Sequence, residues 1–452
     1  MATRDQAHRQ LTENVHHVLP EVRRDLEQLV RIPSVSADKT AAPHLHASAA
    51  AVAAMLRGAG LPEVDVLTVA DGLPVVLGHR PGPPGAPTVL LYAHHDVQPP
   101  GEHGGWTGDP FEPAERDGRL YGRGAADDKA GIAVHLAAVR AHADRLPVGV
   151  TVLAEGEEEI GSPTLADFLA SYRERIQADV VVLADSANPS VDVPALTTSL
   201  RGGVGVTVRV CALDHGVHSG VYGGAVPDAL TALCRMLATL HDENGDVAVP
   251  GLVRGPAGPF ELTESQLRAE SGLLDGVQLI GTGPLTERLW THPAIDVVGL
   301  DAPPVESASN TLIPEARALV SLRIAPGDDA ARACEALITH LRSHAPWGVQ
   351  VTTEPRATVA PYQAKTGGVA YRAAHAALAQ AWGTPAVELG IGGSLGFVTD
   401  FAGAVPHAEL LVTGVEDPDT RAHAPNESLD LKIFERACVA ETLLLANLAD
   451  PS

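Results

Sequence analysis

Three short, continuous apolar runs are the feature that most limits how this chain can fold. They cover residues 87–93, 148–154 and 180–184, and helix-like stretches separate them. Continuous apolar runs of this length are typical of parallel strands that are buried on both faces of a sheet. We therefore predict an α/β fold in which a mainly parallel sheet is flanked by helices.

Each apolar run leads to a side chain that can bind a metal. His94 follows the first run, Glu159 closes the acidic string after the second, and Asp185 follows the third. Because ligands of parallel sheets collect at the carboxyl ends of the strands, these side chains can gather in one site. Asp127 and His423 complete a set of five potential ligands, a pattern typical of hydrolases that use two metal ions.

Composition and charge limit the class of partner. The chain has 452 residues, more than one ordinary core, so we expect two domains. The net charge of −24 argues against nucleic acid and anionic membranes, since both favour a basic surface, and we expect a small soluble substrate. No run is long enough for a membrane span and no apolar signal core opens the chain, so we expect a cytoplasmic protein.

The cysteines indicate no disulfide framework. They are widely spaced, without the close pairs of a zinc knuckle. We expect reduced, buried thiols at Cys211, Cys234, Cys334 and Cys438.

The pattern of apolar and polar residues divides the chain into three segments. Two runs, 203–210 and 316–324, alternate apolar and polar residues, which indicates an antiparallel sheet with one covered face. In the last part of the chain, the continuous apolar runs that are typical of a parallel sheet occur again. We therefore expect one domain in two parts, residues 1–196 and 357–452, with an α+β domain of residues 197–356 inserted between them.

Each local motif leaves a structural alternative open. His94 and Asp96 face the same side of a strand, so the carboxylate can orient the ring of a metal ligand. The alternative is a histidine satisfied beside a turn aspartate. Asp127 and Asp128 are adjacent and would repel each other without a cation, although either could cap a helix. The acidic string 155–159 can combine a metal ligand with a proton carrier, or it can be a solvated loop.

Seven motifs follow one another along the chain, at residues 92–99, 106–113, 120–124, 158–159, 218–220, 392–394 and 423–427. Their order and wording resemble the M20 metallopeptidase family, whose members include dipeptidases, carnosinases, aminoacylases and desuccinylases. The resemblance spans almost the whole chain. It implies a zinc-peptidase-like catalytic domain in two parts and an inserted lid and dimerisation domain.

The resemblance implies how the metal ligands divide. It makes His94 and Asp185 ligands of one divalent ion, Glu159 and His423 ligands of the other, and Asp127 the bridge between them. Mixed histidine and carboxylate ligands suit Zn²⁺, with Mn²⁺ or Co²⁺ as alternatives.

The resemblance also implies the catalytic groups and the substrate contacts. Glu158 is the general base, Asp96 orients a metal-binding histidine, and His218 steadies the developing oxyanion in the other subunit of a homodimer. An arginine is expected to bind the substrate carboxylate through two hydrogen bonds. The implied substrate-binding residues are Arg323, Gly393, Ser394 and Thr311. Relatives often have an asparagine where Thr311 stands, so Asn310 is an alternative contact.

The implied activity is hydrolysis of the amide bond of dipeptides with a free C-terminal carboxylate. Residues 285–290 resemble the dipeptidase and carnosinase-like members in particular. One alternative is an N-acyl-amino-acid hydrolase on the same scaffold. Another is a catalytically silent binding homologue, against which the retention of Glu158 and all five ligands counts. The family also implies a cis peptide bond between Asp127 and Asp128.

Overall fold

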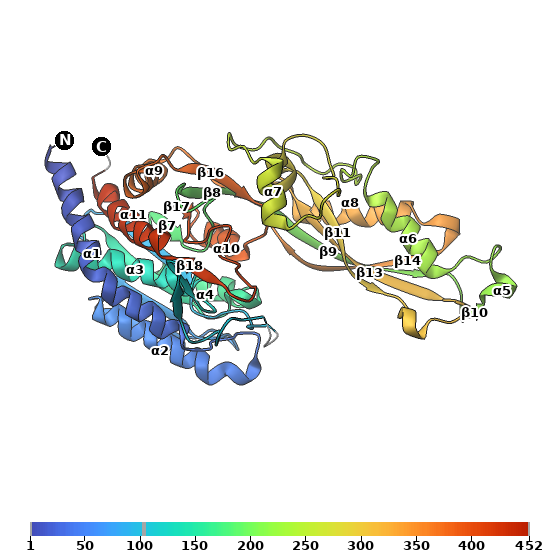
Figure 1. Ribbon diagram of the computed structural model, residues 1–452, viewed down its shortest axis with the longest axis horizontal. Coiled ribbons are helices and arrows are strands. Elements are labelled where there is room, and N and C mark those ends of the chain that lie inside the picture. The colour runs from blue at the N-terminus through green and yellow to red at the C-terminus, as the bar shows by residue number, and fades with distance from the viewer. Residues whose placement is uncertain (1, 102–104, 451–452) are drawn as a thin grey trace. The chain divides into compact units, whose positions relative to one another are not determined.

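The computed structural model describes residues 2–101 and 105–450 and divides into two compact units (Figure 1). Both units are built from more than one stretch of the chain. Unit 1 comprises Met1–Thr198, Ala364–Glu388 and Gly396–Ser452, and unit 2 comprises Ser199–Gln363 and Leu389–Leu395.

The boundaries of unit 2 differ from the expected range of 197–356. The expected end falls inside strand β14 (Gln350–Val359), which continues past a register shift between Pro355 and Thr358. Because β14 is an edge strand, it tolerates a proline without an N–H donor. Leu389–Leu395, which we expected in the catalytic domain, has its contacts in unit 2.

Among the described residues, the largest sheet has nine strands in the order β1-β2-β6-β3-β7-β17-β8-β15, with β16 beside β8. Strands β6, β3, β7 and β17 run parallel at its centre, and β1, β2, β8 and β15 pair antiparallel. Every residue of β6 and β7 is buried, as their apolar runs predict. The strands are β1 (Glu63–Leu67), β2 (Val75–Arg80), β3 (Thr88–His94), β6 (Gly149–Glu155), β7 (Val180–Leu183), β8 (Ala195–Leu200), β15 (Tyr362–Gln363), β16 (Val387–Ile391) and β17 (Glu409–Val412).

Helices cover this sheet. A packed layer consists of α1 (Ala2–Val30), α3 (Lys129–His142), α9 (Val369–Trp382) and α11 (Leu431–Ala449) (Figure 1). Helix α10 (Gly396–Ala404) packs on α4 (Leu165–Ser171), and its Phe397 and Phe401 rings lie 4.8 and 5.1 Å from the ring of Tyr92 in β3. Helix α2 (Ala42–Gly58) contacts β1 and β2. The predicted mixed α/β architecture with a mainly parallel sheet is confirmed.

A small sheet in unit 1 consists of β4 (Ala114–Arg116), β5 (Arg119–Tyr121) and β18 (Ser428–Asp430). Its register joins Tyr121 to Ser428, so two of the seven motifs are neighbours in the fold.

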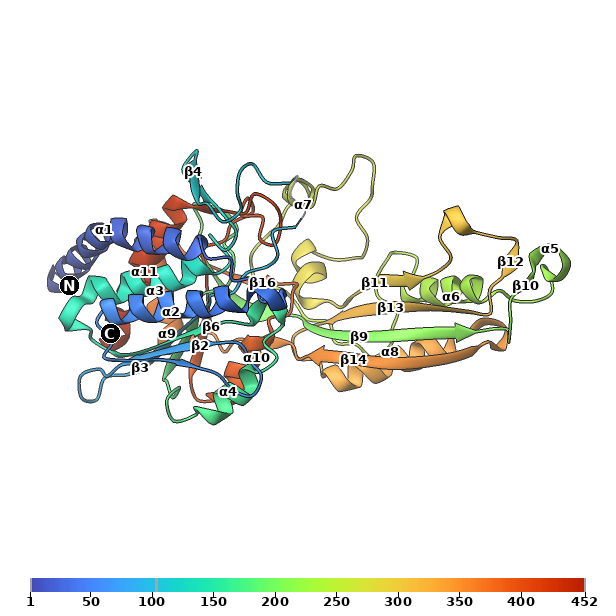
Figure 2. The same ribbon diagram turned by 90° about the horizontal axis from the view of Figure 1, so that it is seen from below.

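Unit 2 is built on an antiparallel sheet in the order β11-β13-β9-β14 (Figure 2). Its strands are β11 (Ala294–Asp301), β13 (Glu315–Ile324), β9 (Gly202–Cys211) and β14. Buried and more exposed residues alternate along β9 and β13, as their sequences predict. Helices α6 (Ala229–Leu237) and α8 (Ala330–Ser343) pack on this sheet. The remaining elements are β10 (Val217–His218), β12 (Thr311–Leu312), α5 (Ser219–Tyr222) and α7 (Glu264–Ser271).

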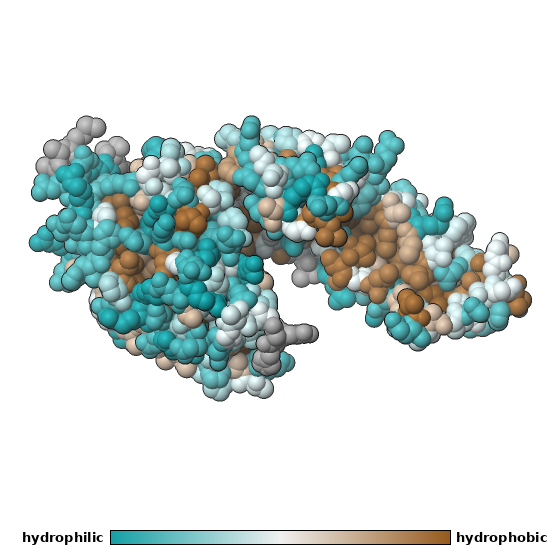
Figure 3. Space-filling model, viewed as in Figure 1, coloured by the Kyte–Doolittle hydropathy of each residue, from teal (hydrophilic) through white to brown (hydrophobic). Residues whose placement is uncertain are grey.

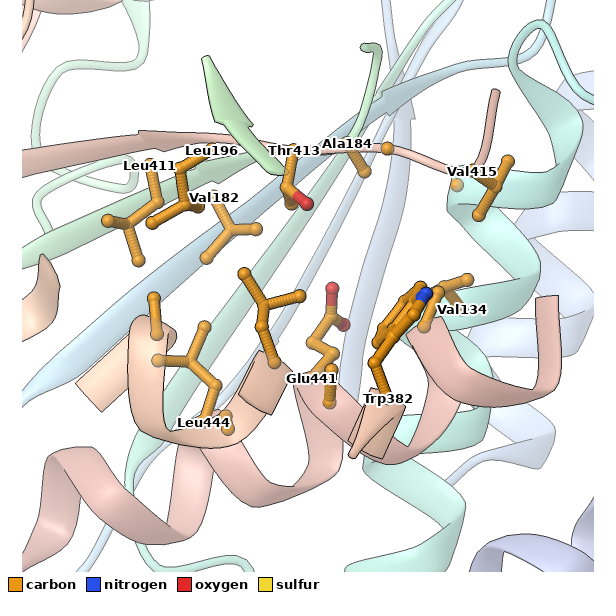
Figure 4. Close-up of a pocket in the computed structure, with 17 residues that line it drawn as sticks. Val134, Val182, Ala184, Leu196, Trp382, Leu411, Thr413, Val415, Glu441 and Leu444 are labelled. Carbon is orange, nitrogen blue, oxygen red and sulfur yellow. The ribbon is translucent and has the colours of Figure 1, made fainter. Parts of the chain in front are cut away.

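A cavity of about 40 Å³ lies within unit 1, lined by strands of the sheet and by α3, α9 and α11 (Figure 4). Apolar side chains dominate its wall, and Thr413 and Glu441 are its main polar members. The Glu441 carboxylate is already bound by His135, whose Nδ1 lies 2.8 Å from it. None of the predicted site residues lines this cavity, so we interpret it as a gap in core packing.

The cysteines form no disulfide in the described chain. Cys334 and Cys438 are buried, Cys211 is half-buried and Cys234 is exposed, so the expectation of a buried thiol is wrong for Cys234. Cys234 lies on α6, an amphipathic helix whose other face covers the sheet. Among the described residues, no helix combines the length and the apolar character that crossing a membrane requires.

Lys129, at the start of α3, joins two helices of unit 1. Its buried Nζ donates to the backbone carbonyls of Leu29 and Ile32, each at 2.8 Å, just where α1 ends. A helix end leaves its last carbonyls without partners inside the helix, and Lys129 satisfies two carbonyls there.

Replacing Lys129 by methionine should therefore destabilise unit 1. One buried and one partly buried carbonyl lose their donor, and we expect a loss of about 2–4 kcal/mol in the free energy of unfolding. Denaturant melts of Lys129→Met and of the matched control Lys39→Met, at an exposed lysine, measure this loss. Equal stability of the two variants would contradict the assignment.

Candidate metal centre

The carboxyl ends of the central strands bring three of the predicted ligands to one edge of the sheet. His94 is the last residue of β3, which pairs in parallel with β6 on one side and β7 on the other. Glu159 lies in the turn Glu158–Ile160 after β6, and Asp185 lies just after β7. The three side chains therefore start from neighbouring strands.

Asp127 lies between two histidines. Its Oδ1 is 3.1 Å from His94 Nε2, and its Oδ2 is 3.0 Å from His423 Nε2. His423 Nε2 is also 3.1 Å from Glu159 Oε2. One carboxylate thus faces a different histidine with each oxygen, which is the arrangement that a carboxylate shared by two cations requires.

The donor atoms form two overlapping groups. Within each group they lie within 4.8 Å of one another, close enough to share a cation. One group contains His94, Asp127 and Glu159, and the other contains His94, Glu158 and Asp185. Glu158, expected to act as a base, is thus near the ligands, with Oε2 4.0 Å from His94 Nε2.

Asp96 contacts both the His94 ring and the loop of Glu158 and Glu159. Its Oδ1 is 3.3 Å from His94 Nδ1, and its two oxygens accept the backbone N–H groups of Glu158 and Glu159 at 3.2 and 3.1 Å. Burial raises the pKa of this carboxyl, but the hydrogen bond to His94 and the charge of that ring lower it by more. Asp96 therefore stays ionised, and it orients the glutamate loop as well as the histidine.

Glu427 is a buried carboxylate to which the sequence assigned no role. It accepts the guanidinium of Arg123 at 2.5 Å and the backbone N–H groups of Gly124, Ala126 and Asp127 at 3.1 to 3.2 Å. It thereby fixes the loop that presents Asp127. Its position within the motif 423–427 was the available signal, but its partners lie about 300 residues away in the sequence.

Gln98 is a second positioning residue that the sequence did not reveal. Its backbone N–H and its side-chain Nε2 donate to the two carboxylate oxygens of Glu159 at 3.0 and 2.8 Å. These two hydrogen bonds fix the orientation of the Glu159 carboxylate before any ligand binds.

The peptide bond between Asp127 and Asp128 is cis, as the family resemblance implied. Asp128 Oδ2 accepts the backbone N–H of His94 at 3.2 Å, whereas its buried Oδ1 has no hydrogen-bond partner. Burial, followed by the charge of Asp185, raises the pKa of Asp128 well above its ordinary value. Asp128 thus helps to position His94 through its backbone N–H.

The electrostatics of the centre fit a cation. Burial, together with neighbouring carboxylates, raises the pKa of Glu158 well above its usual range and that of Asp185 to about 7. Hydrogen bonds to Asp127 and Glu159 raise the pKa of His423 to about 11. Crowded carboxylates and histidines of this kind are the donor set that divalent transition metals prefer.

Two of the remaining predicted residues lie together in unit 2. His218 in β10 pairs with Thr311 in β12, and both are exposed. His218 Nδ1 accepts the N–H of Gly220 at 3.1 Å, which leaves Nε2 free of described protein partners. The alternative contact, Asn310, accepts the N–H of Ser219 through its carbonyl at 2.9 Å.

The other predicted substrate residues form a second group in unit 2. Arg323 Nη1 donates to Ser394 Oγ at 2.8 Å, and Gly393 is the residue before Ser394. Arg323 lies near the end of β13, whereas β10 and β12 lie beyond its start at Glu315 (Figure 2). The length of β13 from Glu315 to Arg323 is about 26 Å. The structure therefore separates Thr311 and His218 from Arg323 and Ser394.

Comparison with known proteins agrees with this geometry. Residues 90–447 match Peptidase family M20/M25/M40. The chain is similar to the Cysteinylglycine-S-conjugate dipeptidase of Corynebacterium striatum, with 35% identity over 403 residues that cover 87% of this chain and 88% of the relative.

Solved structures share the fold. Dug1p, a di-peptidase from Saccharomyces cerevisiae, has a TM-score of 0.82 at 22% identity, and human carnosine dipeptidase 1 has a TM-score of 0.80 at 24% identity. Each comparison covers 98% of both chains. The sequence match over most of the chain and the gathered metal-binding side chains lead to one conclusion: this chain is a metallopeptidase of family M20/M25/M40.

Proposed function

We propose that this M20 peptidase hydrolyses the amide bond of dipeptides that carry a free C-terminal carboxylate, with two divalent ions in each subunit. The observation that carries the proposal is Asp127, whose two oxygens face His94 and His423 from opposite sides. The Corynebacterium striatum relative is named a dipeptidase, and mammalian relatives are named Beta-Ala-His dipeptidases, which supports this substrate class.

We assign His94 and Asp185 to one ion, Glu159 and His423 to the other, and Asp127 to both. Zn²⁺ suits this mixture of imidazole and carboxylate best, and Mn²⁺ or Co²⁺ could replace it. Bound ions of this kind polarise the substrate carbonyl and lower the pKa of water.

Glu158 is our candidate for the general base. Burial holds its pKa high, so its carboxylate is basic enough to take a proton from water and deliver it to the leaving nitrogen. Asp96 binds the backbone N–H of Glu158 and so fixes where that carboxylate points.

We assign the substrate carboxylate to Arg323, Ser394 and Gly393. The guanidinium and the hydroxyl are already 2.8 Å apart, so both can donate to one carboxylate. Such a site favours substrates with a free acid at the C-terminal end.

We infer that the enzyme is a homodimer. An extended dipeptide is only about 7 Å long, so His218 and Arg323 of one chain, about 26 Å apart along β13, cannot contact the same substrate. If both act on one substrate, they come from different subunits. A surface for the second copy is offered by the edge strand β11 (Figure 3), where large apolar side chains are exposed at Val297, Val298 and Leu300.

Two alternative functions and a cellular location were also expected from the sequence. An N-acyl-amino-acid hydrolase is not favoured, because the relatives that match most of this chain are named dipeptidases. A silent homologue would not need the half-buried Glu158 beside the five ligands. The cytoplasmic location stays a prediction.

A substrate panel tests the function directly. The metal-loaded protein should hydrolyse dipeptides faster than the matching N-acetyl amino acids, which lack the free amino group, and faster than dipeptide amides, which lack the free carboxylate. Chelation should abolish activity and Zn²⁺ should restore it. Faster hydrolysis of the N-acetyl amino acids would instead identify an acylase.

The role of Glu158 predicts a separation of binding from chemistry. Glu158→Gln should keep both metals, counted by elemental analysis, and lower kcat by about two to four orders of magnitude, the usual range for losing a general base. Glu157→Gln, which alters a neighbouring buried glutamate bonded to Leu73 and Thr164, is the control. Full activity in Glu158→Gln would refute the assignment.

Subunit sharing predicts complementation. His218→Ala should lower kcat more than it raises KM, because a histidine aimed at the oxyanion acts in the transition state. Mixing His218→Ala chains with Glu158→Gln chains should restore about a quarter of wild-type activity, since half of the random dimers contain one intact site. Proven subunit exchange with no recovery would mean that His218 does not serve a second subunit.

A further inference from the structure

Arg201 is a buried arginine that forms no ion pair with a described acidic residue, although the charge of Asp296 acts on it. It lies between β8 and β9 and is only 8% exposed. Its Nε donates to the carbonyl of Gly392 at 3.0 Å, and its Nη1 donates to the carbonyls of Arg288 and His292, each at 3.3 Å. A buried guanidinium whose bonds all go to neutral carbonyls keeps its full positive charge.

Two glycines show how closely this arginine and its neighbours are packed. A Cβ added at Gly392 would lie 2.6 Å from Arg201 Nη2 and 2.7 Å from the carbonyl oxygen of Leu289. A Cβ added at Gly390 would lie 2.6 Å from the Cβ of Trp290. Arg201 therefore joins the π-helical turn Glu287–Thr291 to the segment that leads to Ser394.

The same segment is held by a second arginine. Arg323 donates to Ser394 Oγ at 2.8 Å and also forms no ion pair with a described acidic residue. Burial and, to a smaller extent, the positive charge of Arg323 lower the pKa of Arg201 to about 10, although the charge of Asp296 acts in the opposite direction. Two guanidinium groups, neither in an ion pair with a described acidic residue, thus hold one short loop in a protein whose net charge is −24. Their mutual repulsion would be relieved by a bound anion.

We propose that Arg201 is a positioning and specificity-determining residue of the substrate-carboxylate site. It fixes the backbone of residues 392–394 through its hydrogen bond to the carbonyl of Gly392. Together with Arg323 it supplies the positive charge that selects a substrate with a C-terminal carboxylate. This inference rests on the proposed dipeptidase function. It also gives the motif of residues 285–290 a role, because the carbonyl of Arg288 helps to hold the guanidinium.

The test compares a dipeptide with the same dipeptide as its C-terminal amide. Arg201→Met should raise KM for the dipeptide by about tenfold or more, the size expected for losing charged hydrogen bonds that hold the binding loop, with a smaller change in kcat. Hydrolysis of the amide should change little, so the preference for the free acid should fall. Arg342→Met is the matched control, because Arg342 is an exposed arginine of the same unit whose side chain donates to the hydroxyl of Thr353.

Arg201→Lys separates charge from geometry and serves if the methionine variant does not fold. Lysine keeps the charge but cannot reproduce the planar fork that reaches three carbonyls. We expect its KM for the dipeptide to rise by about three- to tenfold, with a preference for the free acid between those of wild type and Arg201→Met.

The outcomes separate this inference from the proposed function. A wild-type enzyme that cleaves no dipeptide would refute the function before any variant is made. An active wild type with the same acid-to-amide preference in Arg201→Lys and Arg201→Met would overturn the role of Arg201 alone. Equal losses on both substrates would also overturn it, because a purely structural residue would act in that way.

Discussion

Repulsion among buried carboxylates at the end of the parallel sheet is the constraint on which unit 1 depends. Glu158, Asp185 and Asp128 lie where burial makes each negative charge costly, and the pKa of each is raised. His94 and His423 offset part of that cost through Asp127. Divalent cations would offset far more, which is why the chain can keep so many acids in one place.

The surrounding residues hold the ligands through hydrogen bonds to the backbone. Asp96 fixes the loop of Glu158 and Glu159, and Glu427 fixes the loop of Asp127. If two divalent ions share the Asp127 carboxylate, as we propose, small errors in its position would disturb both. The number of buried partners around Glu427 therefore reflects the accuracy that the centre requires.

Unit 2 separates two tasks along one sheet. The arginines near the end of β13 hold a loop suited to a carboxylate, and the exposed His218 lies beyond the other end. A strand is stiff and long compared with a dipeptide, so this separation leads directly to the proposal of two cooperating subunits. A regular element thus decides which groups of one chain can meet.

The sequence by itself determined the parallel strands and the five ligand candidates, because apolar runs and strand ends are local properties. It also indicated the cis bond between Asp127 and Asp128 through the family resemblance. It could not reveal Glu427, whose partners are backbone amides far away in the chain, or Arg201, whose partners are three carbonyls. Backbone groups carry no residue identity, so a sequence cannot show which of them a buried charge will meet. Only the tertiary structure decided those contacts. It also showed that Leu389–Leu395 belongs to unit 2, because Gly390 packs against Trp290, a residue about 100 positions away in the sequence.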